Sequence, residues 1–167
     1  THTNAQMAAA AVRALARKSG FDLNQLECLC AGTSSPDLVQ PSHGLMVHGE
    51  LATPPCEVHT AAAVCTSAMS ALRYAMLNVQ SGGVRHAISL GSEFSSRYMR
   101  GRNFEPEMES LVAEMERRPE IAFEKDFLRW MLSDGAGAAL VQSQPNPERL
   151  SLRIDWMEMV SLAGDMP

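Results

Sequence analysis

The sequence has few aromatic residues and few cysteines, and it contains no long apolar run. Aromatic side chains make up 5% of the 167 residues, and four cysteines are present. So few cysteines in a chain of this length are not typical of a disulfide framework, and their spacing contains no C-x-x-C pair for zinc. No run of roughly 18 consecutive apolar residues occurs, so we expect no transmembrane helix. With no secretory signal peptide either, we expect a cytoplasmic protein without a metal site.

Positive charge is also scarce. Lysine and arginine together number 14 against 19 acidic residues, which gives a formal net charge of −5. This balance argues against nucleic acid or an anionic membrane as the main partner. Apolar residues make up 46% of the chain and charged residues 20%, as in ordinary globular proteins, and the length suffices for one domain with a core.

Helical and strand-like segments alternate from the first residues onward. A capping box at Thr3 and Gln6 opens the first predicted helix, which Gly20 ends. The periodicity predicts helices over 4–19, 41–51 and from Cys65 to about 82, with strands over 26–33, 56–60 and 84–90. This order is typical of an α/β sheet covered by helices, where ligands usually bind at the carboxyl ends of the strands.

The pattern changes after the third strand. A charged segment follows, and within it we predict an amphipathic helix over 106–118. This helix is either a solvated surface helix, or a lid or docking surface over the site. Two strands are then predicted, at 139–142 and at 150–156, where Leu150, Leu152, Ile154 and Trp156 alternate with polar residues. Turn residues at 144–147 lie between them, so we expect the chain to end in an antiparallel hairpin.

Cys65 holds the position with the clearest chemical meaning. It lies between a run of small residues and a helical pattern, so we expect it at a strand-to-helix turn. The unpaired N–H groups and the positive dipole at a helix N-terminus stabilise an anion, and the thiolate is the nucleophilic form of cysteine. The alternative is a packing role, because free cysteine is among the most buried residue types.

Other cysteines and histidines offer weaker candidates. Cys28 and Cys30 are two residues apart in a predicted strand, so we interpret both as packing residues on one face. A redox role for Cys65 would need a resolving cysteine, and Cys56 in or beside the same strand would be too far away. His59 lies six residues before Cys65, and we consider it as a base, as a core residue or as part of a dimer interface.

Several short motifs follow one another along nearly the whole chain. They are Thr33-Ser34-Ser35-Pro36-Asp37 with Pro41-Ser42, then Ala62-Ala63-Val64-Cys65, Gln80-Ser81-Gly82-Gly83, Leu90-Gly91-Ser92-Glu93 and Ser133-Asp134-Gly135-Ala136-Gly137-Ala138-Ala139. In this order and at this spacing, they resemble the β-ketoacyl-acyl-carrier-protein synthase III branch of the thiolase-like superfamily. The resemblance implies a thiolase-like fold and identifies Cys65 with the family's nucleophile.

The resemblance also implies a mechanism and partners. Cys65 would accept the acyl group of acyl-coenzyme A, and its backbone N–H would contribute to an oxyanion hole. Malonyl carrier protein would then lose carbon dioxide, and its carbanion would attack the acyl-cysteine. No metal or other cofactor is implied. The family suggests a homodimer in which the strand before Cys65 pairs with its copy across a two-fold axis.

The resemblance also indicates what surrounds Cys65. Thr66, Leu132 and Gln40 stand where family members place residues that bind the acyl chain, with Gln40 reaching across a dimer interface. Arg100 or Arg102 could contact the phosphates of coenzyme A or of the carrier protein. Asp134 and the glycines after it we interpret as structural.

Two assisting residues of the family find no match here. A histidine and an asparagine serve the condensation step, and none of the five histidines or five asparagines stands in a matching context. We therefore interpret residues 1–167 as the first thiolase-like half-domain without its opening strand, carrying an inserted helical segment at about 98–131. The second half-domain would supply the assistants, and this chain alone would be inactive.

Two rival functions remain open. The first is a thiolase-fold acyltransferase that forms an ester, an amide or a ring through the same acyl-cysteine. The second is a non-catalytic subunit of a ketosynthase heterodimer, although a cysteine at the nucleophile position argues against it.

Overall fold

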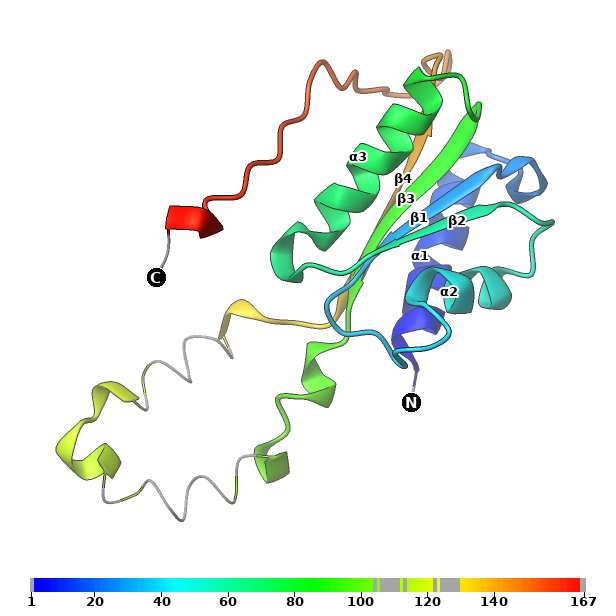
Figure 1. The fold of residues 1–167 in the computed structure, drawn as a ribbon. Helices are drawn as coiled ribbons and strands as arrows, with labels where there is room; N and C mark the ends of the chain where they lie inside the picture. The colour runs from blue at the N-terminus through cyan, green and yellow to red at the C-terminus, as the bar shows by residue number, and fades with distance from the viewer. Residues whose placement is uncertain are drawn as a thin grey trace.

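Four strands form a single mixed sheet in the computed structural model, which describes residues 2–103, 105, 112, 114–121, 123 and 130–165. The strands are β1 (Cys28–Gly32), β2 (Glu57–Ala61), β3 (His86–Glu93) and β4 (Gly135–Gln142), in the order β2-β1-β3-β4 (Figure 1). β1 is parallel to both β2 and β3, whereas β4 is antiparallel to β3. The predicted α/β class with a mostly parallel mixed sheet is therefore confirmed.

Helices cover both faces of this sheet (Figure 1). α1 (Asn4–Ser19) and α2 (His43–Leu51) lie on one face, and α3 (Ser67–Gln80) lies on the other. The larger core, under α1 and α2, includes Val12, Leu29, Val47, Ile88 and Leu90. The smaller core, under α3, is built mainly from alanines and from Cys28 and Cys30. Because β1 is covered on both faces, its sequence is a continuous apolar run rather than an alternating one.

The local signals at α1 act as predicted. The backbone N–H of Gln6 donates to Thr3 Oγ1 at 3.1 Å, and the N–H of Thr3 donates to Gln6 Oε1 at 3.2 Å. The helix ends before Gly20, whose positive φ of 74° suits glycine. α2 begins at His43, two residues after the predicted start at Pro41, and Ser42 is its N-cap residue.

The interpretation of Cys28 and Cys30 as packing residues is confirmed. Both side chains are fully buried, and their thiols are free and 3.4 Å apart. For Cys28, the hydrogen bond between the two thiols outweighs burial and lowers the pKa. For Cys30, the same hydrogen bond and burial both raise the pKa. The pair therefore fills the core under α3 as two short apolar side chains.

The predicted final hairpin is wrong in its second strand. Residues 151–162 have no regular secondary structure, and the side chains of Leu150, Leu152 and Trp156 are 91%, 86% and 79% exposed. β4 forms its antiparallel pair with β3 instead, with Glu93 opposite Gly135. Alternating polarity predicts a half-buried strand only where a neighbouring strand completes its hydrogen bonds, and none of the described residues does so for 150–156.

The segment between β3 and β4 is described only in part. It contains short 3₁₀ turns at Ser95–Arg97 and Gly101–Asn103. The helix predicted over 106–118 lies largely outside the described residues. Among the described helices, none combines the length and the apolar character that crossing a membrane requires.

Candidate active site

Cys65 lies in a tight turn between β2 and α3. A 3₁₀ turn at Val64–Thr66 follows the carboxyl end of β2 and leads directly into α3 at Ser67. The thiol is free and its residue is exposed. Thr66 donates from both its backbone N–H and its hydroxyl to the Ala63 carbonyl, each at 2.9 Å. The sequence prediction of a cysteine at a strand-to-helix turn is thus confirmed in position.

The residue before Cys65 has an unusual backbone. Val64 has a φ of +30°, in the left-handed region that β-branched residues rarely adopt. The residue is 72% exposed, so core packing does not explain this conformation. The hydroxyl of Ser67 donates to the Val64 carbonyl at 2.7 Å and helps to hold the turn. Backbone strain of this kind is found at functional sites, where the surrounding structure fixes it.

Two glycines bring the start of α3 against the sheet. A Cβ on Gly32, at the end of β1, would overlap the Ser67 carbonyl and would lie 2.6 Å from the Ala68 nitrogen. A Cβ on Gly91, in β3, would lie 2.6 Å from the Ala68 Cβ. Both glycines therefore permit an approach that a side chain would block, and this approach places the Cys65 turn at the carboxyl edge of the parallel strands.

The predicted substrate residues occupy neighbouring segments of the same edge. Gln40 is exposed in the connection from β1 to α2. Arg100 and Leu132 both line a hollow of about 480 Å³, together with Ser95, Ser96, Met99, Ser133 and Asp134. Arg102 is exposed in the next turn and does not line this hollow. The structure therefore brings Arg100 and Leu132 together, while the Thr66 hydroxyl is engaged within its own turn.

Asp134, one of the residues that line this hollow, connects two segments of its wall. Its carboxylate accepts the backbone N–H of Ser96 at 2.8 Å and the Ser96 hydroxyl at 2.6 Å. These bonds join the chain leaving β3 to the chain entering β4, so Asp134 is structural, but through a contact that the sequence did not indicate.

His59 makes its main contact with α3. Its ring stacks on Tyr74 with centroids 4.0 Å apart and planes 3° from parallel. The Tyr74 hydroxyl donates to Glu57, and Asn78 Nδ2 donates to the same carboxylate at 2.9 Å. These bonds lower the pKa of Glu57 and raise that of Tyr74 to about 12. His59 is therefore placed as part of the β2–α3 contact.

Cys56 and Cys65 lie at opposite ends of the same strand, β2. Cys56 precedes β2, whereas Cys65 follows it, and five strand residues span roughly 16 Å at 3.3 Å each. This separation is too large for a disulfide between them.

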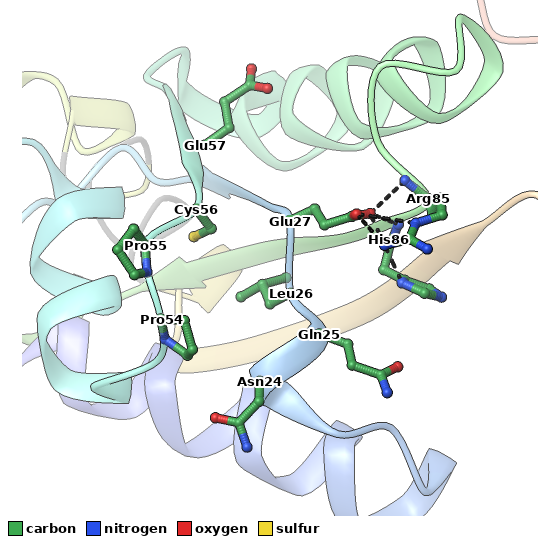
Figure 2. A pocket seen from close by; sticks show the side chains of 10 residues that line it. All are labelled: Asn24, Gln25, Leu26, Glu27, Pro54, Pro55, Cys56, Glu57, Arg85 and His86. Atoms are coloured by element: carbon green, nitrogen blue, oxygen red, sulfur yellow. Dashed lines mark hydrogen bonds and ion pairs between the residues drawn. The ribbon is translucent and has the colours of Figure 1, made fainter.

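A larger hollow, of about 790 Å³, lies at the amino edge of the sheet (Figure 2). Its polar wall is already paired, because the Glu27 carboxylate accepts hydrogen bonds from Arg85 and from the backbone N–H of His86 at 3.0 Å. The bonds from Arg85 are the main cause that lowers the pKa of Glu27 to about 2. Glu27 thus joins the starts of β1 and β3. Ligands of open α/β sheets bind at the other edge, and we do not assign this hollow to the reaction.

Several residues that support the carboxyl edge were not predicted. The Asp37 carboxylate accepts the N–H groups of Asn4 and Ala5 at 2.9 and 2.8 Å, and so caps α1 from a distant loop. His43, with 1% of its surface exposed, contacts Ser92 Oγ through Nε2 at 2.9 Å. Burial lowers the pKa of His43, against the charges of Asp37 and Glu93. No local sequence signal indicates these long-range pairs. Within the described part of the chain, no three acidic, histidine or cysteine residues are arranged to hold a metal ion.

Known proteins resemble this chain in sequence and in fold. No family model matches the chain. The β-ketoacyl-[acyl-carrier-protein] synthase III of Roseobacter denitrificans is 35% identical over 97 residues, which are 58% of this chain and 30% of that protein. Synthase III 1 of Vibrio cholerae is 26% identical over 152 residues, covering 91% of this chain and 41% of that protein. The chain thus spans less than half the length of these curated relatives.

Solved structures share the fold. A tetronic acid condensing enzyme matches 86% of this chain and 39% of its own with a TM-score of 0.66 at 23% identity. The 3-oxoacyl-(acyl carrier protein) synthase III of Pseudomonas aeruginosa PAO1 matches 87% of this chain and 38% of its own with a TM-score of 0.65 at 16% identity. The fold is that of thiolase-like proteins. Within that class, the resemblance of the sequence to β-ketoacyl-acyl-carrier-protein synthases III is confirmed.

Proposed function

We propose that this chain carries the nucleophile of an acyltransferase that condenses an acyl thioester with malonyl carrier protein. One observation supports this most directly: Cys65 is exposed in a strained turn at the start of α3, at the carboxyl edge of the parallel strands. The proposed setting is fatty acid, specialised lipid or polyketide biosynthesis in the cytoplasm, and the names of the relatives support the synthase part of this proposal.

The proposed first step is transfer of the acyl group to Cys65. The thiolate attacks the thioester carbonyl, the carbon–sulfur bond to coenzyme A breaks, and free coenzyme A leaves as its thiolate. The N–H of Cys65 lies at the beginning of the turn into α3, where amides are not all paired within the helix, and it can donate to the developing oxyanion. Small neighbours at Ala62 and Ala63 leave the sulfur accessible.

The proposed second step needs groups beyond those assigned in this chain. The malonyl group on its carrier protein loses carbon dioxide, and the resulting carbanion attacks the acyl-cysteine carbonyl and releases Cys65. We propose that residues 1–167 form the first half-domain, with an inserted segment at about 98–131, and that a second half-domain supplies the assisting histidine and asparagine. The first half-domain alone would then not complete the condensation.

Recognition of the substrates is assigned to the carboxyl edge. Arg100 is proposed to contact a phosphate of coenzyme A or of the carrier protein, with Arg102 as the neighbouring candidate. Three residues are proposed to contact the acyl chain: Gln40, Thr66 and Leu132. Of these, Leu132 lines the same hollow as Arg100. A homodimer is proposed through the outer edge of β2, which pairs with β1 on one side only within the described sheet. The reaction as proposed needs no metal or other cofactor.

A second candidate reaction uses the same acyl-cysteine to form an ester, an amide or a ring. Its support is the likeness in fold to a tetronic acid condensing enzyme. Product analysis with the natural polypeptide that contains this chain distinguishes the two. Condensation predicts release of carbon dioxide and a product two carbons longer, whereas the rival predicts acyl transfer to an oxygen or nitrogen acceptor without chain extension.

The non-catalytic alternative has its own test. A Cys65→Ala variant in the assembled protein should lose nearly all turnover if Cys65 is the acyl acceptor, since loss of a covalent nucleophile typically costs a factor of roughly 10⁴ or more. Full activity in this variant would instead support a structural subunit.

A further inference from the structure

Successive residues at the end of β3 hold both ends of the loop that carries Gln40. The Glu93 carboxylate accepts the Ser34 N–H at 2.7 Å and the Ser35 hydroxyl at 2.5 Å. Ser92, the preceding residue, contacts His43 at 2.9 Å. The β1–α2 connection is therefore held near its start by Glu93 and at its end by Ser92. Gln40 lies between these two attachments.

The attachment at Glu93 is also joined to the next segment of the chain. Ser35 Oγ, which donates to Glu93, accepts the backbone N–H of Phe94 at 2.8 Å. The chain then continues through Ser95 to Arg100, which lines the hollow that also contains Leu132. The loop with Gln40 and the segment with Arg100 therefore share the support that Glu93 and Ser35 form.

The first part of the loop cannot easily shift to compensate for a loss at Glu93. Asn4 Nδ2 donates to the Ser35 carbonyl at 2.8 Å, and Arg97 Nη1 donates to the Asp37 carbonyl at 3.1 Å. The side chain of Asn4 is fully buried, and Ser35 is 7% exposed. In this well-packed setting, the Glu93 carboxylate and the Asn4 amide together hold the backbone of residues 34–35.

We propose that Glu93 is a positioning residue that couples the Gln40 loop to the segment bearing Arg100, and so sets acyl-chain selection together with thioester binding. The second part of this inference, the effect on acyl-chain selection and thioester binding, rests on the proposed function. The first part, the mechanical coupling of the two segments, stands on the hydrogen bonds alone.

The test compares Glu93→Gln with a matched control, Glu27→Gln. Both carboxylates join strand ends, but Glu27 does so at the amino edge, away from Cys65. Two quantities are measured in the natural polypeptide: amide hydrogen exchange in residues 33–42 and 94–100, and the ratio of Cys65 acylation rates with a short and a long acyl-coenzyme A. A ratio is unaffected by a uniform loss of active protein.

Glu93→Gln should speed exchange in both segments together and change the chain-length ratio by roughly tenfold, whereas Glu27→Gln should leave both nearly unchanged. Faster exchange in one segment only, or an unchanged ratio, would overturn the proposal. If Glu93→Gln does not fold, Ser35→Ala removes one of the two donors and must give the same pattern in smaller degree. Absence of acylation in the wild type would refute the proposed function, and the exchange data would then decide the coupling alone.

Discussion

At the scale of single residues, the site depends on positions where a side chain is absent or where the backbone adopts an unfavourable conformation. Gly32 and Gly91 let α3 approach the sheet, and Val64 adopts a positive φ immediately before Cys65. The run of small residues followed by a helical pattern placed Cys65 correctly at a strand-to-helix turn. It did not indicate the strain at Val64, because valine ordinarily favours extended backbone.

Substitution of Gly32 tests the close approach of α3. Gly32→Ala would place a methyl group against the backbone of Ser67, which cannot give way as a flexible side chain could. We expect a loss of about 1–3 kcal/mol in the free energy of unfolding, measured by urea denaturation. The control is Gly49→Ala in α2, where the new Cβ meets nothing within 4 Å. That control should be neutral or stabilising by about 0.5–1 kcal/mol, and equal losses in both variants would contradict this account.

His43 provides a prediction about pH. Its pKa is lowered by burial in the folded state, so the unfolded chain takes up the proton first as pH falls below roughly 6.5. Stability should therefore decrease with falling pH from that point, by at most about 1.4 kcal/mol per pH unit, until the folded form is protonated as well.

The measurement is urea denaturation of the wild type and of His43→Gln between about pH 7.5 and pH 5. The variant should lose most of this slope, because glutamine does not titrate. Glu27→Gln serves as a control. The lowered pKa of Glu27 makes stability depend on pH only near and below pH 4.5, the ordinary pKa of the carboxyl group, which lies under the range measured. An identical slope in the wild type and in His43→Gln would refute the assignment.

At the scale of elements, the sequence was most informative where the signals are local. The capping box and Gly20 gave α1 its bounds, and β1 and β3 followed from apolar runs. The strand predicted at 150–156 was wrong because alternating polarity carries no information about whether a partner strand is present. The cap that Asp37 places on α1 could not be predicted either, because it joins residues 33 positions apart.

Removal of the segment after β4 tests the corrected assignment. The comparison is made between two isolated polypeptides, residues 1–149 and residues 1–167. The shorter one lacks Leu150, Leu152 and Trp156, which are largely exposed in the structure. We therefore expect the thermal midpoint to change by less than about 2 °C, with less aggregation, since little apolar burial is lost. A fall of roughly 10 °C or more would mean that this segment packs as a strand after all.

At the scale of the whole molecule, the topology gathers the chemistry at one edge. The three parallel strands end beside the loop with Gln40, the Cys65 turn and the segment that leads to Arg100. The sequence predicted this edge through the α/β alternation and the order of the motifs. It could not predict which residues fix the edge, because Glu93, His43 and Asp134 act through contacts between segments distant in sequence.

The central claim is that Cys65 accepts an acyl group. The most direct measurement is a peptide-mapped mass spectrum of the natural polypeptide after incubation with a panel of acyl-coenzyme A thioesters. We predict one acyl adduct on the peptide containing Cys65, absent in Cys65→Ser and retained in Cys56→Ser, which alters a half-buried thiol at the other edge of the sheet. The absence of any adduct, or an adduct that persists in Cys65→Ser, would contradict the account.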